Sequence, residues 1–211
     1  MNKIHQSDNF FEDNGNHSFW QRKFGPTLGA VLAFFVEIVQ IIIISAAIII
    51  PIRYFLIQPF YVRGASMEPS FYDNEYLIID EISYRFREPQ RGEIVVFRYP
   101  LDTSEFFIKR VVAIPGDTIE ISDQKIRIYN EDHLNGVLLD ETSYLFEEPT
   151  PGHQKRTLNQ DEYFVLGDNR DASLDSRSFG PITKQDMIGR VWIRGLPVSR
   201  IHVFDIPDYN L

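Results

Sequence analysis

The sequence predicts a mainly β protein, in which an antiparallel all-β domain follows one N-terminal transmembrane helix. Two observations support this prediction. A single long apolar segment lies near the N-terminus, and the remainder of the chain alternates short β-branched and aromatic segments with turn residues. With 211 residues, the chain can hold one domain and a membrane anchor but hardly two full domains.

Residues 28–50 form the apolar segment and predict a transmembrane helix. A helix of this length extends about 34 Å at about 1.5 Å per residue, and the apolar core of a bilayer is about 30 Å thick. A buried core helix is the alternative. A cleaved signal peptide fits less well, because its apolar region is shorter and begins closer to the N-terminus. Pro51 is expected to end or kink the helix.

The apolar segment divides the chain into three expected parts. Residues 1–27 would form a cytoplasmic tail, residues 28–50 the membrane span, and residues 51–211 an extracytoplasmic β domain. The positive-inside rule favours this orientation because three basic residues precede the span and two closely follow it. Those before it are Lys3, Arg22 and Lys23, and those after it are Arg53 and Arg63.

The β domain is predicted from short segments rich in Val, Ile, Phe and Tyr, which turn residues such as Pro115-Gly116-Asp117 separate. The segments expected to be strands are 76–79, 93–99, 106–114, 118–121, 125–129, 163–166 and 189–193. Many short strands with frequent turns are typical of an antiparallel sheet or a barrel-like domain. Residues 122–160 are more polar and are expected to form a surface insertion.

The composition excludes several classes of function. The chain has 30 acidic and 21 basic side chains, a net charge of -9, so no nucleic-acid partner is expected. It contains no Cys, which excludes disulfides, zinc-thiolate sites and thiol catalysis. The five histidines are scattered without the spacing of metal ligands, so neither a metal nor another cofactor is expected.

One expected strand carries a lysine between apolar residues. Alternation along the strand places Phe107, Lys109 and Val111 on the same face. Desolvation among apolar side chains lowers the pKa of a lysine, and a neutral amine near pH 7 can act as a general base. The competing interpretation is an edge-strand lysine whose amine reaches water. A chemical partner for the amine is needed to choose between them.

A candidate partner is Ser66, which follows two small residues in an expected loop. It belongs to the first of four segments: SMEP at 66–69, RGEIVVF at 91–97, KRVVAIPGD at 109–117 and GDNRDASLDSRSFG at 167–180. In this order, behind a membrane anchor, the segments resemble the motif series of the bacterial type I signal peptidases. The resemblance covers the chain from the anchor almost to the C-terminus. Because one membrane span is predicted, the chain most resembles the single-span members of the family.

The resemblance implies roles for individual residues. Ser66 would be the nucleophile and Lys109 its general base. Ser173 would hydrogen-bond to that lysine and orient it. Asp175 and Arg177 would form a carboxylate–guanidinium pair that braces the site. Asp168 and Arg170, of the same motif, would fix its loop.

The resemblance also implies an all-β catalytic domain and an activity. The family cuts exported preproteins after small residues at the first and third positions before the cut, and a shallow apolar groove would reject larger side chains. Candidate groove residues are Phe60, Tyr61, Val62 and Met67. The expected partners are therefore preprotein signal peptides and membrane lipid, and residues 55–61 are a candidate for contact with the membrane interface.

Two positions depart from the family pattern. Ser70 and Phe71 stand where many members have Thr-Leu, a change that keeps a hydroxyl at the first position. Gly64 stands where some members place a Ser whose hydroxyl contributes to the oxyanion hole. The hole would then use backbone N–H groups, including that of Ser66.

Three alternatives are less consistent with these residues. A Ser–Lys autoprotease of the self-cleaving repressor type carries a DNA-binding module where this chain has an apolar anchor. An inactive membrane-tethered binding domain would be marked by loss of Ser66 or Lys109, and both are present. A signal peptidase subunit of the endoplasmic reticulum would have His at position 109.

Overall fold

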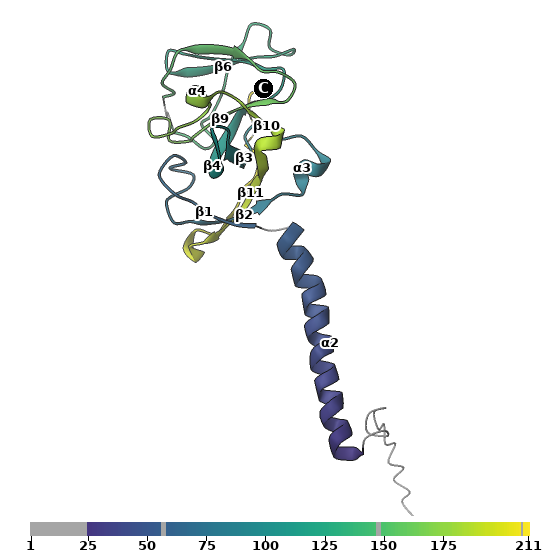
Figure 1. Cartoon of the computed structure of the whole chain (residues 1–211). Helices are drawn as coiled ribbons and strands as arrows, with labels where there is room; N and C mark the ends of the chain where they lie inside the picture. Colours follow the sequence, from purple (N-terminus) through teal and green to yellow (C-terminus); the bar gives the residue numbers. More distant parts are fainter. Residues whose placement is uncertain (1–24, 56–57, 147–148, 208) are drawn as a thin grey trace, which may run out of the picture. The chain divides into compact units, whose positions relative to one another are not determined.

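The computed structural model describes residues 25–55, 58–146, 149–207 and 209–211, and the chain divides into two compact units, Met1–Pro51 and Ile52–Leu211. Within the described residues, the one long helix is α2 (Pro26–Phe55). The other unit is built mainly of antiparallel strands, as Figure 1 shows. The predicted fold class, mainly antiparallel β with a single N-terminal apolar helix, is confirmed.

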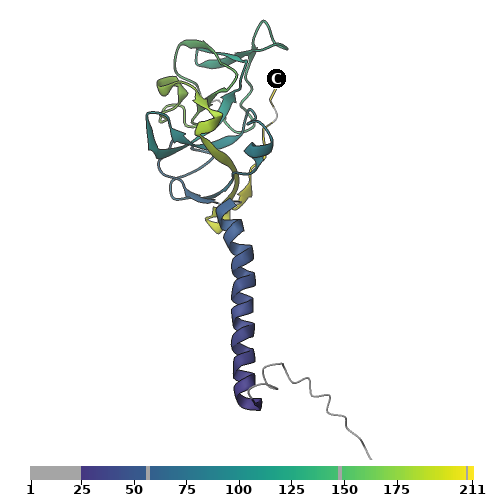
Figure 2. The ribbon, with the colours of Figure 1, turned by 45° about the vertical axis from the view of Figure 1, so that its right-hand side comes forward.

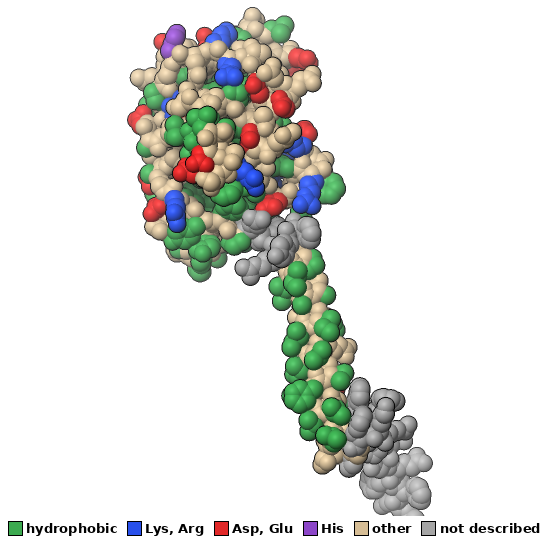
Figure 3. All heavy atoms as spheres, viewed as in Figure 1, with side chains coloured by type: hydrophobic (Ala, Val, Ile, Leu, Met, Phe, Trp, Pro, Cys, Tyr) green, Lys and Arg blue, Asp and Glu red, His purple; other side chains and the backbone are tan. Residues whose placement is uncertain are grey.

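Helix α2 is long and apolar enough over Thr27–Pro51 to cross a membrane, and no residue of its 18-residue apolar stretch is buried. A core helix of a soluble domain would bury it, so the exposure disfavours that alternative. On the face shown in Figure 3, the side chains along α2 are mainly hydrophobic. Pro51 does not end the helix, which continues to Phe55. Proline removes one backbone hydrogen bond, and here that loss does not prevent the following residues from being helical.

The remaining elements are short. The strands of the first sheet are β1 (Gln58–Tyr61), β2 (Tyr76–Asp80), β3 (Ile94–Tyr99), β4 (Asp102–Ala113), β9 (Glu162–Leu166), β10 (Ile182–Thr183), β11 (Met187–Leu196) and β12 (His202–Val203). Those of the second sheet are β5 (Thr118–Ser122), β6 (Lys125–Tyr129), β7 (Val137–Leu138) and β8 (Gln154–Thr157). The short helices are α3 (Ser83–Phe86), α4 (Ser176–Phe179), η1 (Lys184–Asp186) and η2 (Val198–Arg200).

The larger sheet has the strand order β1-β2-β11-β3-β4-β9-β10, with β12 paired to β11, and the smaller has the order β7-β6-β5-β8. Each segment that the sequence predicted to be extended overlaps one of these strands, and only the end residues Glu93 and Ile114 fall outside them. Strands β1, β7, β8, β10 and β12 were not predicted, because they are short or polar and are extended through pairing with neighbours.

Residues 122–160 are more than a loop on the surface. Strands β6, β7 and β8 all come from this region. Its side chains Ile126, Ile128 and Leu158 are buried in one hydrophobic cluster together with Phe164 of β9. Alternation within 125–129 was the signal for a strand, but only the structure shows that this region builds most of the second sheet.

A second hydrophobic cluster lies beneath the loop between β1 and β2. Met67 and Phe71 of this loop are buried there against Leu77, Ile79 and other side chains of β2, β3 and β11. Burial of side chains of this size contributes about 1.5–3 kcal/mol each. The loop is therefore anchored on both sides of Glu68–Pro69, and its position relative to the sheet is determined by packing.

Candidate active site

Ser66 lies in the loop between β1 and β2, and contacts of the neighbouring residues on both sides hold it in place. Gly64 adopts a φ of 83°, a left-handed conformation that glycine takes readily, and its N–H donates to the Asp73 carboxylate at 2.8 Å. Behind the serine, Met67 is buried in the core. The carbonyl of Ser66 accepts a hydrogen bond from the Asn169 N–H at 3.1 Å. These contacts fix the direction in which the Ser66 hydroxyl points.

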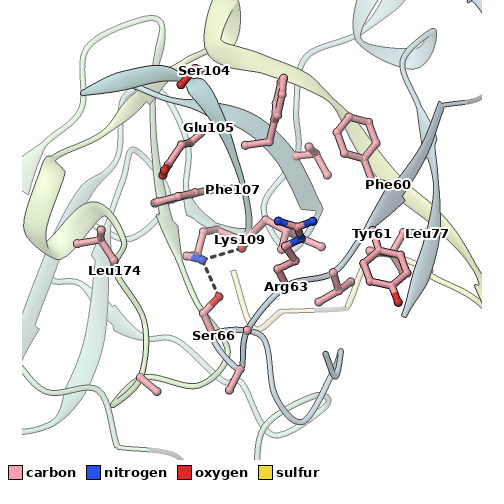
Figure 4. A pocket seen from close by; sticks show the side chains of 17 residues that line it. Phe60, Tyr61, Arg63, Ser66, Leu77, Ser104, Glu105, Phe107, Lys109 and Leu174 are labelled. Atoms are coloured by element: carbon pink, nitrogen blue, oxygen red, sulfur yellow. Dashed lines mark hydrogen bonds between the residues drawn. The ribbon is translucent and has the colours of Figure 1, made fainter. Parts of the chain in front are cut away.

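Lys109 reaches this hydroxyl from β4. Its Nζ lies 2.8 Å from the Oγ of Ser66 and donates to the carbonyl of Ile108 at 2.9 Å. The side chain is buried, with 4% exposure. Figure 4 shows the amine directed toward Ser66, with Phe107 and Leu174 on one side of the pair.

Burial changes the acid–base chemistry of this amine. Desolvation lowers the pKa of Lys109 from 10.5 to about 8, and the negative charges of Asp175 and Asp168 oppose part of that shift. Strand β4 pairs with β3 on one side and β9 on the other, so Lys109 lies within the sheet and not at its edge. The edge-strand interpretation of this lysine is therefore wrong.

The segment after β9 closes the site. Gly167 allows a close approach, since a Cβ at this position would lie 2.5 Å from the carbonyl oxygen of Ser66 and 2.2 Å from the Oγ of Ser173. The hydrogen bond that we expected between Ser173 and Lys109 is not formed. Instead the Ser173 hydroxyl is buried beside Gly167 without a partner among the described residues. The Lys109 amine instead hydrogen-bonds to the Ser66 hydroxyl and to the Ile108 carbonyl.

Asp175 and Arg177 form the ion pair that we expected. Arg177 donates through Nε and Nη2 to the two carboxylate oxygens of Asp175, at 2.8 Å each. Asp175 is fully buried, accepts a hydrogen bond from the Gly167 N–H at 3.1 Å, and caps helix α4 through the Arg177 N–H. The pair therefore holds Gly167 where Ser66 and Ser173 pack against it.

Asp168 and Arg170 do not pair with each other. Asp168 accepts two hydrogen bonds from Arg110, at 2.9 and 2.7 Å, and one from the Ser70 hydroxyl. Arg170 donates to the Gly167 carbonyl at 3.0 Å and pairs with Glu141. Ser70, a position where the sequence departs from the family pattern, thus keeps its hydroxyl in the network.

The sequence analysis missed Arg110 and Glu141 as partners in these pairs. A signal existed for Arg110. Its neighbour Lys109 occupies one face of a buried strand, so alternation places Arg110 on the other, and a buried guanidinium needs a carboxylate. No comparable signal existed for Glu141, which lies in a polar region without a motif and meets Arg170 only through the tertiary fold.

A cavity of about 690 Å³ opens over Ser66 and Lys109. Three of the four predicted groove residues, Phe60, Tyr61 and Val62, line it. Met67 does not: the prediction for this residue is wrong, because its side chain is 1% exposed and packs in the core beneath the loop. The walls are completed by side chains that were not predicted for the groove. The apolar ones are Ala65, Leu77, Val96, Phe106, Phe107, Ile108, Ala172 and Leu174, and the polar ones are Arg63, Ser104 and Glu105.

The site brings together side chains suited to nucleophilic catalysis. Among the described residues, no group of three or more His, Asp or Glu side chains is placed to hold a metal ion. The arrangement combines a hydroxyl, a desolvated amine within hydrogen-bond distance of it, and an apolar cavity above both. These are the components of nucleophilic catalysis by a serine with an adjacent base.

Comparisons with known proteins identify the family of this chain. The family model described as signal peptidase, peptidase S26, matches residues 35–195. A probable signal peptidase I-2 of Synechocystis sp. is 36% identical over 78% of this chain and 75% of its own length. A signal peptidase I of Leptolyngbya laminosa is 34% identical over 78% of this chain and 81% of its own length.

More distant relatives carry the same description. Signal peptidase IB of Staphylococcus aureus is 28% identical over 75% of this chain and 87% of its own length. The crystal structure of a signal peptidase I from Enterococcus faecalis, with 30% identity, covers 49% of this chain and 97% of that one with a TM-score of 0.40, a score too low to support a statement about the fold.

Proposed function

The chain belongs to the peptidase S26 family of signal peptidases and is an enzyme of the signal peptidase I type, and on this basis we propose that Ser66 and Lys109 form its catalytic dyad. The observation that carries the proposal is the distance of 2.8 Å between the Nζ of Lys109 and the Oγ of Ser66. It is supported by the burial that lowers the pKa of Lys109 to about 8.

The reaction would proceed in two stages. The neutral amine of Lys109 takes the proton of the Ser66 hydroxyl while the Oγ attacks the scissile carbonyl. The tetrahedral intermediate collapses as the leaving amine takes that proton from Lys109, and an acyl-enzyme remains. Lys109 then removes a proton from water, the hydroxide attacks the ester, and Ser66 regains its proton.

The negative oxygen of each tetrahedral intermediate needs hydrogen-bond donors. Gly64 brings no hydroxyl to this position, and its N–H is already bonded to Asp73. The backbone N–H of Ser66 is the donor that we propose. One such donor contributes about 2.7–4 kcal/mol to the transition state in other proteases.

The substrates would be exported preproteins cut after small residues at the first and third positions before the cut. The apolar walls contributed by Phe60, Tyr61 and Val62 support this selectivity, because large side chains in a shallow apolar groove would clash with them. The expected loss on enlarging a substrate residue by one methylene is about 10- to 200-fold in kcat/KM.

Cleavage of a preprotein that carries an Ala-x-Ala site tests the dyad. The detergent-solubilised full chain should cut it, and the Ser66→Ala and Lys109→Met variants should each lose the activity. Equal cleavage by all three proteins would show that another site is responsible. No cleavage by any of them, with the fold intact by circular dichroism, would favour an inactive binding domain.

The membrane location indicated by α2 leads to a proposal on orientation. We place residues 1–27 in the cytoplasm, residues 28–50 in the membrane and residues 51–211 outside the cytoplasm, on the basis of the basic residues that precede the span. Because the chain has no Cys, a single introduced cysteine can report on which side of the membrane its position lies. In intact cells, a membrane-impermeant maleimide should label Glu131→Cys and not Asn16→Cys; the reverse pattern would overturn the orientation.

Tethering enzyme and signal peptide in one bilayer raises their effective concentration. Residues 55–61 are a further candidate for membrane contact, although residues 56 and 57 lie outside the described part of the chain. In the described part, Tyr61 is 46% exposed and packs edge-on against Tyr76, which is 42% exposed. A variant lacking residues 1–50 should still float with lipid vesicles, and failure to float would overturn this contact.

A further inference from the structure

A tight turn at residues 141–145 contacts two of the arginines that surround the site. The backbone N–H groups of Tyr144 and Leu145 donate to the Glu141 carbonyl at 3.1 and 2.8 Å. The Glu141 carboxylate pairs with Arg170, and the ring of Tyr144 stacks on Arg110 with its centroid 3.8 Å from the guanidinium carbon. The turn belongs to none of the motifs that carry the family resemblance.

Arg110 needs such a neighbour because it is buried. Its exposure is 3%, and its Nε and two Nη atoms bond to Asp168 and the Gly92 carbonyl in the plane of the guanidinium. These in-plane bonds do not cover the two flat faces of the guanidinium. Because Arg110 is buried, water does not cover them either. An aromatic ring attracts a cation across its face, with about 2 kcal/mol or more when the pair is desolvated.

The C-terminal residues hold Tyr144 over Arg110. The Tyr209 hydroxyl donates to the Tyr144 hydroxyl at 3.0 Å, and Asn210 bonds to the Leu138 carbonyl at 2.8 Å and to the Asp140 N–H at 3.0 Å. Gly92 leaves room for the tail, since a Cβ there would lie 2.7 Å from the Tyr209 ring. In Figure 1 and Figure 2 the C-terminus lies at the end of the unit that carries the second sheet.

The Arg110–Asp168 pair in turn reaches the Ser66 loop at two points. Asp168 accepts from the Ser70 hydroxyl, and the Arg110 Nη2 lies 3.3 Å from the same oxygen. The residue after Asp168, Asn169, donates its N–H to the Ser66 carbonyl at 3.1 Å. A shift of Asp168 would therefore move the loop both at Ser66 and at Ser70.

We propose that Tyr144 is a positioning residue for catalysis, which stacks on Arg110, holds the Arg110–Asp168 pair in place and so fixes the loop of Ser66. This inference rests on the proposed role of Ser66. Tyr144 does not line the cavity over Ser66 and Lys109, so it acts through Arg110 and not by touching substrate.

Three substitutions separate positioning from a general loss of structure. Tyr144→Leu removes the ring and should lower kcat by about tenfold to a hundredfold, with KM within about twofold, because the reacting atoms are misplaced while the groove is untouched. Tyr144→Phe keeps the ring, so its kcat should lie within about threefold of the parental value. The remaining loss would come from the hydrogen bonds of the missing hydroxyl. Tyr129→Leu is the matched control.

Tyr129 makes the same kinds of contact in the second sheet and does not line the cavity over Ser66 and Lys109. Its ring centroid lies 4.0 Å from the amine of Lys155 on β8, and its hydroxyl donates to Glu120 on β5. Tyr129→Leu should leave kcat and KM at the parental values. An equal loss in this variant, or a loss in Tyr144→Leu that appears only in KM, would overturn the proposal.

All variants are assayed as the full chain in detergent, beside Ser66→Ala. If Ser66→Ala is active, both the dyad and this inference are overturned. If Ser66→Ala is inactive but folded Tyr144→Leu has the parental kcat, this inference alone is overturned. If Tyr144→Leu does not fold, Tyr209→Leu decides, because it removes the ring that packs edge-on at 6.1 Å against Tyr144 and leaves Arg110 stacked. It should lower kcat in the same direction but less, and parental kcat would overturn the proposal.

Discussion

The amine of Lys109 lies 2.8 Å from the hydroxyl oxygen of Ser66, although the two residues are separated by 43 positions in the chain. The contact joins a strand inside the larger sheet to a loop that the core anchors through Met67 and Phe71. Neither side chain can move away without disturbing packed elements. Packing therefore holds the two side chains within hydrogen-bond distance of each other, as the proposed dyad requires.

The pH dependence of kcat/KM should follow the Lys109 amine. Burial lowers its pKa to about 8, and only the neutral amine can accept the Ser66 proton. Activity should therefore fall as pH decreases through about 8 and reach a plateau above it. Initial rates at low substrate concentration, from pH 6 to pH 10, measure this profile. A midpoint near 10.5, the ordinary value for lysine, would contradict it.

The same burial makes a prediction about stability. Between pH 8 and 10.5 the unfolded chain binds a proton at Lys109 that the folded chain does not, so the free energy of unfolding rises with pH in this window. The rise amounts to about 3 kcal/mol when the shift is converted at about 1.4 kcal/mol per pKa unit. Lys109→Met should lack it. Urea titrations of both proteins at pH 7.5 and 10.5 would reveal the difference, and parallel pH dependence would count against it.

Replacement of Gly167 should impair the site severely. The Cβ of Gly167→Ala would lie 2.5 Å from the Ser66 carbonyl oxygen and 2.2 Å from the Ser173 Oγ, so the segments must separate. We expect kcat to fall by about a hundredfold. Gly195→Ala is the control, since the nearest atom to its Cβ is 3.9 Å away. Similar rates for the two variants in the cleavage assay would show that the close approach is dispensable.

Substitution of Asp175 should have two separable effects. Asp175→Asn leaves Arg177 without its charged partner in a largely buried pair, and the free energy of unfolding should fall by about 3 kcal/mol. It also removes the negative charge that raises the pKa of Lys109 against desolvation, so the midpoint of the kcat/KM profile should move below about 8. Thermal unfolding and the pH profile are the two measurements.

The exposed pair of Lys155 and Glu120 provides the comparison for Asp175. Its side chains are 54% and 28% exposed, and such pairs contribute about 0–1 kcal/mol. Glu120→Gln should change neither stability beyond this range nor the pH midpoint. If Asp175→Asn behaved in the same way, the bracing role of the Asp175–Arg177 pair would have to be abandoned.

Much of the architecture could be predicted because its signals are local. Alternating apolar residues predicted the strand at 125–129, and an apolar segment long enough for a bilayer predicted α2. Strands such as β1 and β8 could not be predicted in this way. Pro59 and the polar residues 154–157 carry no strand pattern of their own, and they become extended by pairing with β2 and β5.

The sequence by itself determined the order of the motifs, and their resemblance to a known family predicted the class of the protein and the two residues of the candidate dyad, since motifs are local in the chain. Only the tertiary structure decided which partners the other charged groups take: Asp168 with Arg110, Arg170 with Glu141, and the Ser173 hydroxyl beside Gly167 in place of Lys109. Ion pairs and hydrogen bonds act over a few ångströms, so their partners depend on how distant segments pack together and not on their positions in the chain.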